Sequence, residues 1–290
     1  MTTYTVHPHQ IITDSQREQL LEDGFLILPR FIPEDELPEL QAAQRRVLRT
    51  WDEVRADPPS GRSAMVPYPH GDARAARHYF HPELLRLGRW WLRTDHVLAR
   101  VGMMIARYPG FVTADAGHID NANNSLLPMS ESAREFGQIG FWIHLEEVGA
   151  GEAPLRLVRR RDGDDVGAAV PLVCAPGTIA VFTNYTVHAA STFTADAGQR
   201  FTWGYGLGRA DHVWEGFHAY TMYGTDPAFR AAVSAMSPDE RALMSFPAVG
   251  HRYYTAQTLA ALERQYPGWD ATGAYAAALR TTADEASGRG

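Results

Sequence analysis

Short β-branched and aromatic segments between turn residues fill the middle of this chain. They are QIGFWIHLEEV, APLRLV, GTIAVFTNYTVHAAS and RFTWGYGLG, and Gly, Pro and Asp residues separate them. This spacing is typical of an antiparallel sandwich or barrel. We therefore expect a mainly β core over about residues 106–210.

Helical patterns precede this core. Ser15 and Glu18 form a capping box for a short helix that Gly24 ends, and the apolar strand FLILPRFI follows. The segment PEDELPELQAAQRRVLRTW predicts a second helix. From Pro82 the apolar positions as far as Ile105 keep nearly helical spacing, which predicts a third, long helix.

The domain organisation follows from these patterns. Helical character returns after about residue 225, for example in SPDERALM with its capping box. We expect helical flanks over about residues 15–105 and 211–276, and a disordered tail over about residues 277–290. Because the sequence has neither an internal repeat nor a sharp shift in composition, we expect one domain over residues 1–290.

Composition excludes several classes of function. All 27 basic residues are arginines, and the absence of lysine excludes Schiff-base enzymes, pyridoxal-phosphate enzymes and P-loop nucleotidases. The only cysteine, Cys174, excludes an internal disulfide and a multi-cysteine zinc site. A net charge of −7 disfavours a nucleic-acid partner, because affinity for the phosphate backbone is built from clustered positive charge.

The hydropathy of the chain bears on its location. No run approaches the ~20 apolar residues that a membrane-spanning helix requires. The N-terminal segment lacks the basic region and the apolar stretch of a secretory signal. We therefore expect a cytoplasmic protein that acts on a small molecule without a membrane partner, either as a monomer or as a homodimer.

Histidine and an acidic residue stand two positions apart at four places. With 12 histidines and 34 acidic residues in 290 positions, chance alone predicts about 1.4 such pairs. The pairs are His70-Gly-Asp72, His81-Pro-Glu83, His118-Ile-Asp120 and His144-Leu-Glu146. Residues i and i+2 of a strand point to the same face, so such a pair can present an imidazole and a carboxylate to one metal ion.

The surroundings of the four pairs differ. The pair at His70 lies in a Pro/Gly-rich loop, and the proline after His81 disfavours a central strand. The pairs at His118 and His144 both remain open as metal sites, and the second is the rival of the first. A polar strand face is the commoner explanation for His144 with Glu146.

A third ligand would have to come from a distant strand. Fe(II) oxygenases bind their metal through two histidines and one carboxylate on one face of an octahedron. FTNYTVHAAS supplies His188, 68 positions after Asp120, although a lone histidine is more often a hydrogen-bonded core residue. Arg200 and Thr202 follow on one strand face, and a guanidinium helped by a hydroxyl suits the far carboxylate of a dicarboxylic keto acid.

Several segments together resemble the phytanoyl-CoA dioxygenase family of Fe(II)- and 2-oxoglutarate-dependent oxygenases. The segments are LLEDGFLILPRFIPEDELPEL, GHID, FWIHLEEVGAGEAPLRLV and PGTIAVFTNYTVHAASTFTADAGQRFTWGYG. Their order and spacing are similar to those of the family over about residues 18–208. The resemblance implies a double-stranded β-helix core, that is, a jelly roll of the cupin type, with flanking helices.

The resemblance also implies site residues. His118, Asp120 and His188 would bind iron, Arg200 would hold 2-oxoglutarate, and Thr202 would be a second contact to it. The implied enzyme is a non-haem dioxygenase that uses Fe(II), 2-oxoglutarate and O2. It would oxidise, most simply hydroxylate, an aliphatic C–H bond of a small molecule, and secondary metabolites are candidate substrates.

Halogenation is disfavoured, because related halogenases replace the metal-binding carboxylate with a small residue and this chain has Asp120. His144 stands where the family tends to carry a small or apolar residue, and LVRRRDGDD replaces a frequent Pro-Gly-Ser-His turn. We expect substrate contacts from Asn121, Asn123, Trp142 and His144. Two alternatives stay open: a non-redox, metal-dependent isomerase of the cupin type, and a metal-free binding protein on the same scaffold.

Overall fold

The computed structural model describes residues 5–68, 80–114, 116–119, 138–210, 227–244, 246, 248–251 and 254–287. The contacts divide the chain into two compact units, one of residues 4–219 and one of residues 220–290 with residues 1–3. That residues 1–290 form a single domain stays a prediction.

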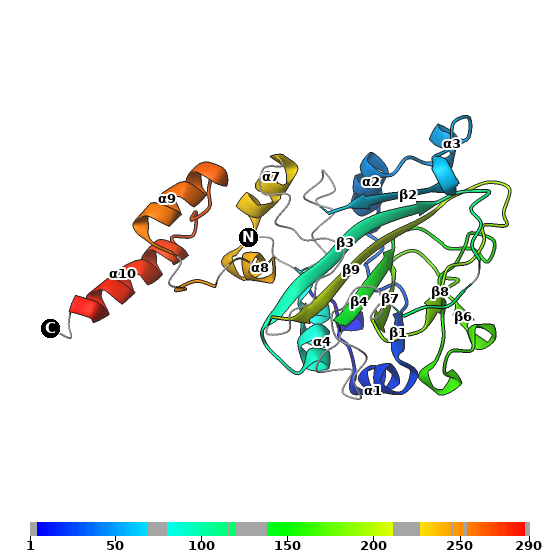
Figure 1. The fold of residues 1–290 in the computed structure, drawn as a ribbon, viewed down its shortest axis with the longest axis horizontal. Coiled ribbons are helices and arrows are strands. Elements are labelled where there is room, and N and C mark those ends of the chain that lie inside the picture. The colour runs from blue at the N-terminus through cyan, green and yellow to red at the C-terminus, as the bar shows by residue number, and fades with distance from the viewer. Residues whose placement is uncertain are drawn as a thin grey trace. The chain divides into compact units, whose positions relative to one another are not determined.

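The larger unit is built on antiparallel strands (Figure 1). The strands are β1 (Phe25–Leu28), β2 (Ser63–Pro67), β3 (Val97–Arg107), β4 (Gln138–His144), β5 (Arg156–Leu157), β6 (Val170–Pro171), β7 (Thr178–Thr183), β8 (His188–Ala189) and β9 (Arg200–Arg209). Among the described residues one sheet has the order β1-β7-β4-β9-β3-β2 and the other the order β6-β5-β8. The strands therefore form two sheets and not a closed barrel.

Helices flank these sheets and make up the smaller unit. The α-helices are α1 (Asp14–Asp23), α2 (Leu37–Val47), α3 (Trp51–Val54), α4 (Pro82–Leu92), α7 (Pro227–Ala235), α8 (Pro238–Leu243), α9 (Ala256–Gln265) and α10 (Ala274–Ser287). Short 3-10 turns are η1 (Pro8–Gln10), η2 (Ser60–Arg62), η4 (Arg160–Asp162) and η5 (Val166–Ala168). The expected class, mainly β with flanking helices, is confirmed.

The long helix predicted from Pro82 to Ile105 is wrong beyond Leu92. Arg93 ends α4 in the left-handed conformation, with φ 54° and ψ 40°. The apolar residues that follow form β3, which pairs with both β2 and β9. The sheet therefore includes strands that precede residue 106, because backbone pairing with β9 outweighs the near-helical spacing of the side chains.

Two smaller predictions also need correction, the capping box of α1 and the disordered tail. The box that caps α1 is formed by Thr13 and Gln16 and not by Ser15 and Glu18, whereas Gly24 ends the helix as predicted, with φ 81°. The disordered tail predicted from residue 277 is wrong as far as residue 287, because α10 runs to Ser287.

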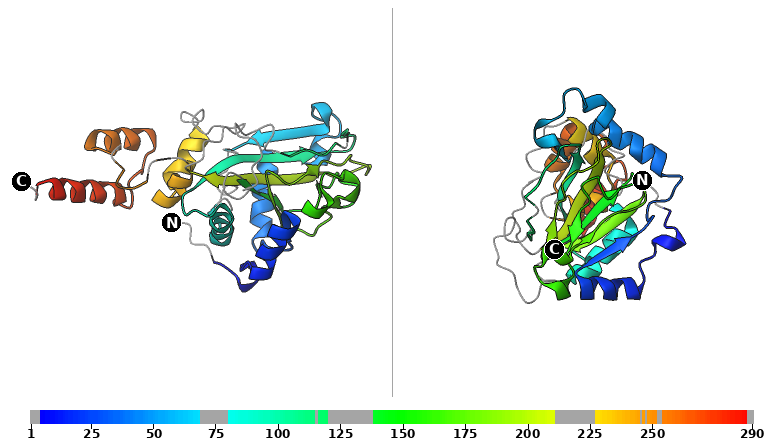
Figure 2. Two further views of the ribbon diagram at one scale, coloured as in Figure 1. Left: turned by 60° about the horizontal axis from the view of Figure 1, so that its bottom comes forward. Right: turned by 90° about the vertical axis from the view of Figure 1, so that its right-hand side faces the viewer.

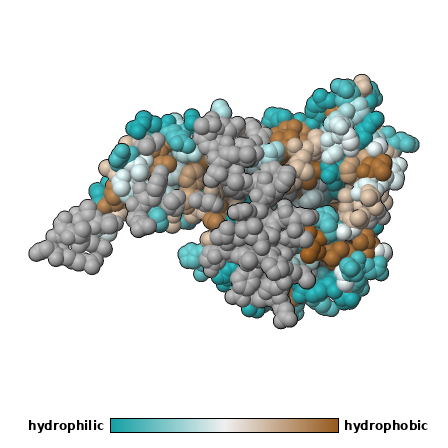
Figure 3. Space-filling model, in the orientation of Figure 1, coloured by the Kyte–Doolittle hydropathy of each residue, from teal (hydrophilic) through white to brown (hydrophobic). Residues whose placement is uncertain are grey.

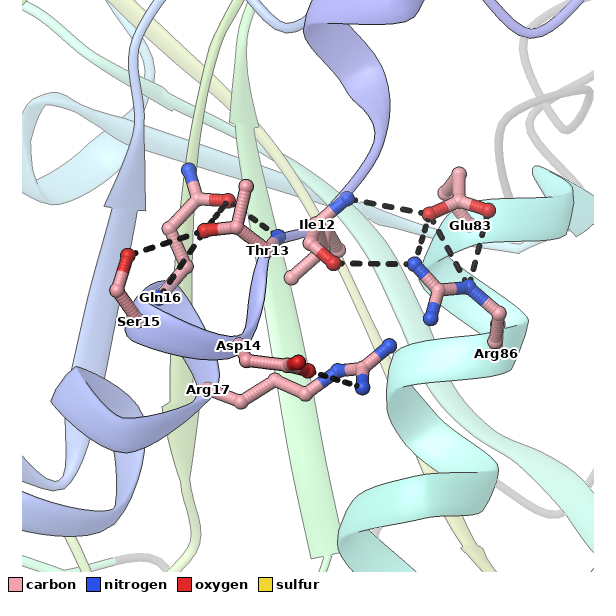
Figure 4. Close-up of polar contacts among 8 residues, drawn as sticks. All are labelled: Ile12, Thr13, Asp14, Ser15, Gln16, Arg17, Glu83 and Arg86. Atoms are coloured by element: carbon pink, nitrogen blue, oxygen red, sulfur yellow. Dashed lines mark hydrogen bonds and ion pairs between the residues drawn. The ribbon is translucent and has the colours of Figure 1, made fainter.

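The segment before α1 is tied to α4 through main-chain polar groups (Figure 4). The backbone N–H of Ile12 donates to Glu83 Oε2 at 3.2 Å, and Arg86 Nη2 donates to the carbonyl of Ile12 at 3.1 Å. Glu83 and Arg86 also form an ion pair within α4. These bonds satisfy backbone groups outside regular structure and fix the entry of the chain into α1.

Helix α4 packs across β3, β4 and β9 on one face of the larger sheet, and α1 lies beside it (Figure 2). The buried residues of α4 include Leu84, Leu87 and Trp91. Gly88 allows the close approach, because a Cβ at that position would lie 2.5 Å from Leu207 Cδ1 of β9. This helix layer leaves the opposite face of the sheet to the site described below.

The smaller unit has its own core around Trp269. The guanidinium of Arg241 lies 4.1 Å from the centroid of the Trp269 ring and is 2% exposed. It donates from Nε to the Val233 carbonyl at 3.0 Å and from Nη1 to the Trp269 carbonyl. The capping box predicted at the start of SPDERALM is present, with Ser237 and Glu240 bonded to each other's backbone.

In the coloured part of the view in Figure 3, hydrophobic residues are interspersed with hydrophilic ones. The most exposed large hydrophobic side chain among those described is Val112, at 74%. Within the described part of the chain, every helix is too short or too polar to cross a membrane.

Candidate active site

A cavity of about 410 Å³ lies between the two sheets. Its lining comes from β3, β4, β7 and β9 of the larger sheet and from β8 with its neighbours. Three of the lining positions are glycines, Gly140, Gly204 and Gly206. Because no side chain projects from these positions, the wall formed by β4 and β9 leaves room for a ligand.

His118 and His188 meet at one end of this cavity. Their backbones exchange two hydrogen bonds of 3.0 Å, and their ring centroids are 4.3 Å apart. His188 is 4% exposed and its Nδ1 lies 2.9 Å from the carbonyl oxygen of Thr186. Since a carbonyl can only accept, Nδ1 carries the proton and Nε2 carries the lone pair that a metal ligand needs.

Three of the expected site residues, Asp120, Asn121 and Asn123, lie outside the described residues. Among the residues that the structure does describe, no three His, Cys, Asp or Glu side chains form a group that could hold a metal ion. Of the three expected metal ligands, the structure describes His118 and His188. The complete set of three stays a prediction.

Arg200 is a buried cation with two guanidinium nitrogens that lack a hydrogen bond in the described structure. It lines the cavity and is 2% exposed, yet neither Nε nor Nη1 has a hydrogen-bond partner. Burial lowers the pKa of Arg200 to about 9, and the charge of Arg107 lowers it further in the same direction. A desolvated charge without a counter-ion is unfavourable, so this position favours an anionic ligand.

Thr202 lies two residues further along β9 and is fully buried. Its Oγ1 also lacks a hydrogen-bond partner. The two residues expected to hold a keto acid are therefore both present as buried polar groups on one strand face.

Sequence reasoning missed Arg107. It is the cross-strand neighbour of Arg200 and also lines the cavity, and burial lowers its pKa to about 10. Its guanidinium donates to Ser63 Oγ and lies 4.5 Å from the centroid of the Phe111 ring. Arg107 lies just beyond the helix predicted to end at Ile105, and only the pairing of β3 with β9 brings it beside Arg200.

The rival pair, His144 with Glu146, does not share one strand face, because β4 ends at His144. Glu146 is held by Arg45 at 2.6 Å and by Gln199 at 3.1 Å. His144 is fully buried, and its pKa falls to about 3 through burial and the nearby charge of Arg200, with a smaller opposing effect of the Phe201 backbone. This geometry disfavours the rival metal site.

Trp142, one of the expected substrate contacts, lines the cavity. Its ring centroid is 5.7 Å from that of Phe182, which lines the same space. His144, two residues further along the same strand, is fully buried and is not among the residues that line the cavity.

The family model described as phytanoyl-CoA dioxygenase (PhyH) matches residues 20–201, which is more than half of the chain. Comparison with curated proteins gave no sequence match.

Three solved structures illustrate what the chain is similar to. EvdO2 from Micromonospora carbonacea var. aurantiaca, complexed with 2-oxoglutarate, has a TM-score of 0.54 at 18% identity, covering 72% of this chain and 94% of its own. The carbocyclase SnoK from nogalamycin biosynthesis has a TM-score of 0.57 at 15% identity, covering 78% and 95%. The epimerase SnoN from the same biosynthesis has a TM-score of 0.51 at 16% identity, covering 68% and 82%. The likeness shows the expected jelly-roll fold of the cupin type.

Proposed function

Because the chain belongs to the phytanoyl-CoA dioxygenase (PhyH) family, we propose that it is a non-haem Fe(II)- and 2-oxoglutarate-dependent oxygenase. The finer proposal is that it hydroxylates an aliphatic C–H bond of a small molecule. Secondary metabolites are candidate substrates, since SnoK and SnoN are described as enzymes of nogalamycin biosynthesis.

The observation that carries this proposal is the buried Arg200 guanidinium, whose Nε and Nη1 lack hydrogen-bond partners, in the same cavity as the His118–His188 pair. A keto acid with a second carboxylate supplies the counter-ion that Arg200 lacks. Two neutral imidazoles are suitable ligands for iron, and Asp120, next but one to His118 in the sequence, adds the carboxylate.

Each described residue then has a definite task. His118 and His188, with Asp120, hold Fe(II), and the Thr186 carbonyl fixes the orientation of the His188 ring. Arg200 and Thr202 hold the far carboxylate of 2-oxoglutarate. When bound, the metal and 2-oxoglutarate supply the oxidation chemistry, consuming O2 and releasing succinate and CO2.

The cavity wall places apolar surface around this chemistry. Trp142 and Phe182 contribute aromatic surface, and Ile105 adds an aliphatic side chain. We propose Trp142 as a contact to the substrate, together with Asn121 and Asn123.

The main alternatives to hydroxylation are ring closure and epimerisation with the same co-substrate, because SnoK is described as a carbocyclase and SnoN as an epimerase. A non-redox isomerase of the cupin type has no use for a buried guanidinium at Arg200, which disfavours that alternative. A metal-free binding protein has no use for the juxtaposed His118 and His188 rings.

An anaerobic spectrum tests the proposal without a known substrate. Metal-free protein is titrated with Fe(II) and then with 2-oxoglutarate, and a weak visible charge-transfer band is expected only with both. The band should be absent from Asp120→Ala and Arg200→Ala proteins whose circular dichroism is unchanged. Folded wild-type protein that binds Fe(II) but gives no band with 2-oxoglutarate would contradict the proposal.

A further inference from the structure

Three buried polar side chains with unsatisfied polar atoms lie together where β4 meets the start of β9. They are His144, Arg200 and Thr202, with exposures of 0%, 2% and 0%. Nε and Nη1 of Arg200 and Oγ1 of Thr202 lack a hydrogen bond, and the ring nitrogens of His144 have none of normal geometry, with only a contact to the Phe201 backbone that slightly raises the His144 pKa. Buried polar groups are nearly always satisfied, so three together indicate a missing ligand.

The strand register places these residues side by side. In the pairing of β4 with β9, Ile143 lies opposite Trp203, so the next pair along the same antiparallel register is His144 with Thr202. Arg200 stands two residues from Thr202 on the same face of β9. His144 and Arg200 are therefore diagonal neighbours across the two strands, and the charge of Arg200 helps to lower the pKa of His144.

A packing role alone does not account for His144. An imidazole whose only polar contact is a distorted one to the Phe201 backbone costs more to bury than a leucine or phenylalanine of similar size. The neighbours of His144 along the chain, Ile143 and Leu145, are fully buried apolar residues. A carboxylate offers two oxygens with about four acceptor positions, enough for a guanidinium, a hydroxyl and one imidazole N–H.

We propose that His144 binds the co-substrate: a ring N–H donates to the far carboxylate of 2-oxoglutarate, beside Arg200 and Thr202. This inference rests on the proposed function and assigns His144 to the co-substrate and not to the substrate. A neutral imidazole adds a donor without adding a second positive charge next to Arg200. His144 therefore contributes to the selection of a dicarboxylic keto acid over a monocarboxylic one.

Two keto acids of equal chain length test this assignment. 2-Oxoglutarate and 2-oxopentanoate share the chelating end and differ only in a carboxylate or a methyl group at the other end. Dissociation constants for both are measured by anaerobic calorimetry on the Fe(II)-loaded protein. The variants are His144→Leu, which removes the donor, His144→Gln, which keeps an N–H, and Cys174→Ala, a control near the same guanidinium.

We expect wild-type protein and Cys174→Ala to prefer 2-oxoglutarate strongly. In His144→Leu this preference should fall about tenfold or more, which is the scale of one hydrogen bond to a charged group. Binding of 2-oxopentanoate should stay unchanged, and His144→Gln should recover part of the preference.

The outcomes separate the two proposals. If wild-type protein prefers 2-oxoglutarate and His144→Leu keeps the full preference, the role of His144 is overturned while the proposed function stands. If Fe(II)-loaded wild-type protein binds neither keto acid, the proposed function fails and the role of His144 fails with it. Equal weakening of both keto acids in His144→Leu indicates a general disturbance of the site and also overturns the assignment.

Discussion

The imidazole rings of His118 and His188 lie 4.3 Å apart, centroid to centroid, in two segments that hydrogen-bond to each other through their backbones. The bridge between these segments holds both rings at one end of the cavity. A pair of histidines fixed in this way is prepared for a metal before the metal arrives, because little side-chain freedom remains to be lost on binding.

Replacement of His188 tests the metal site. Loss of a neighbour that only orients a ligand typically weakens metal binding 10–100-fold, so His188→Ala should weaken Fe(II) binding by about 100-fold or more. The measurement is an anaerobic competition titration against a coloured chelator. The exposed His96 gives the matched control, and unchanged Fe(II) affinity in His188→Ala would contradict its role as a ligand.

Replacement of Arg200 should separate binding from stability. Arg200→Met removes the charge that pairs with the far carboxylate, so affinity for 2-oxoglutarate should fall by about 100-fold or more. Without 2-oxoglutarate the same variant should melt at a higher temperature than wild type, because it removes a buried, unpartnered charge.

The affinity and the melting temperature are measured on the same preparation of each protein. Calorimetry gives the affinity, and thermal unfolding of the ligand-free protein gives the melting temperature. A lower melting temperature in Arg200→Met would show that the guanidinium has a stabilising partner in the free protein.

The pH dependence of stability tests the environment of His144. Its pKa falls from 6.5 in the unfolded chain to about 3 in the folded protein, mainly through burial. Between these values the unfolded state binds the extra proton, so this residue makes the free energy of unfolding rise with pH. The slope approaches about 1.4 kcal/mol per pH unit for one proton.

Urea unfolding of ligand-free protein between pH 4.5 and 6.5 measures this slope. His144→Leu should unfold with a smaller pH dependence and with equal or greater stability at the acid end of the range. A slope that is the same in both proteins would mean that His144 is already charged, or solvated, in the folded state.

The contact between α4 and the sheet depends on Gly88. In Gly88→Ala the new Cβ would lie 2.5 Å from Leu207 Cδ1, so that side chain has to move. Overpacking of this kind costs about 1–3 kcal/mol in the free energy of unfolding, which urea denaturation can measure. The double variant with Leu207→Ala should show less than the sum of the two losses, and additive losses would contradict a direct clash.

Local sequence signals predicted much of the framework correctly. Gly24 ends α1 in the left-handed conformation, and Ser237 with Glu240 caps α8, because capping depends on residues within a few positions of each other. The short β-branched and aromatic runs between turn residues also predicted β4 and β9, and the order of the motifs predicted the family.

Contacts between distant segments decided the rest. The sequence from Val97 to Arg107 carries apolar residues at a spacing that suits a helix, yet it forms β3 because β2 and β9 offer backbone partners on both sides. The same pairing places Arg107 beside Arg200, which no local pattern indicates.

The role of the histidines divides in the same way. The sequence by itself determined which residues can bind metal or a carboxylate, because that follows from the chemistry of their side chains. Only the tertiary structure decided that His118 meets His188 while His144 lies buried near Arg200. Burial and hydrogen-bond partners arise from strands far apart in the chain, so the difference between these histidines exists only in the folded protein.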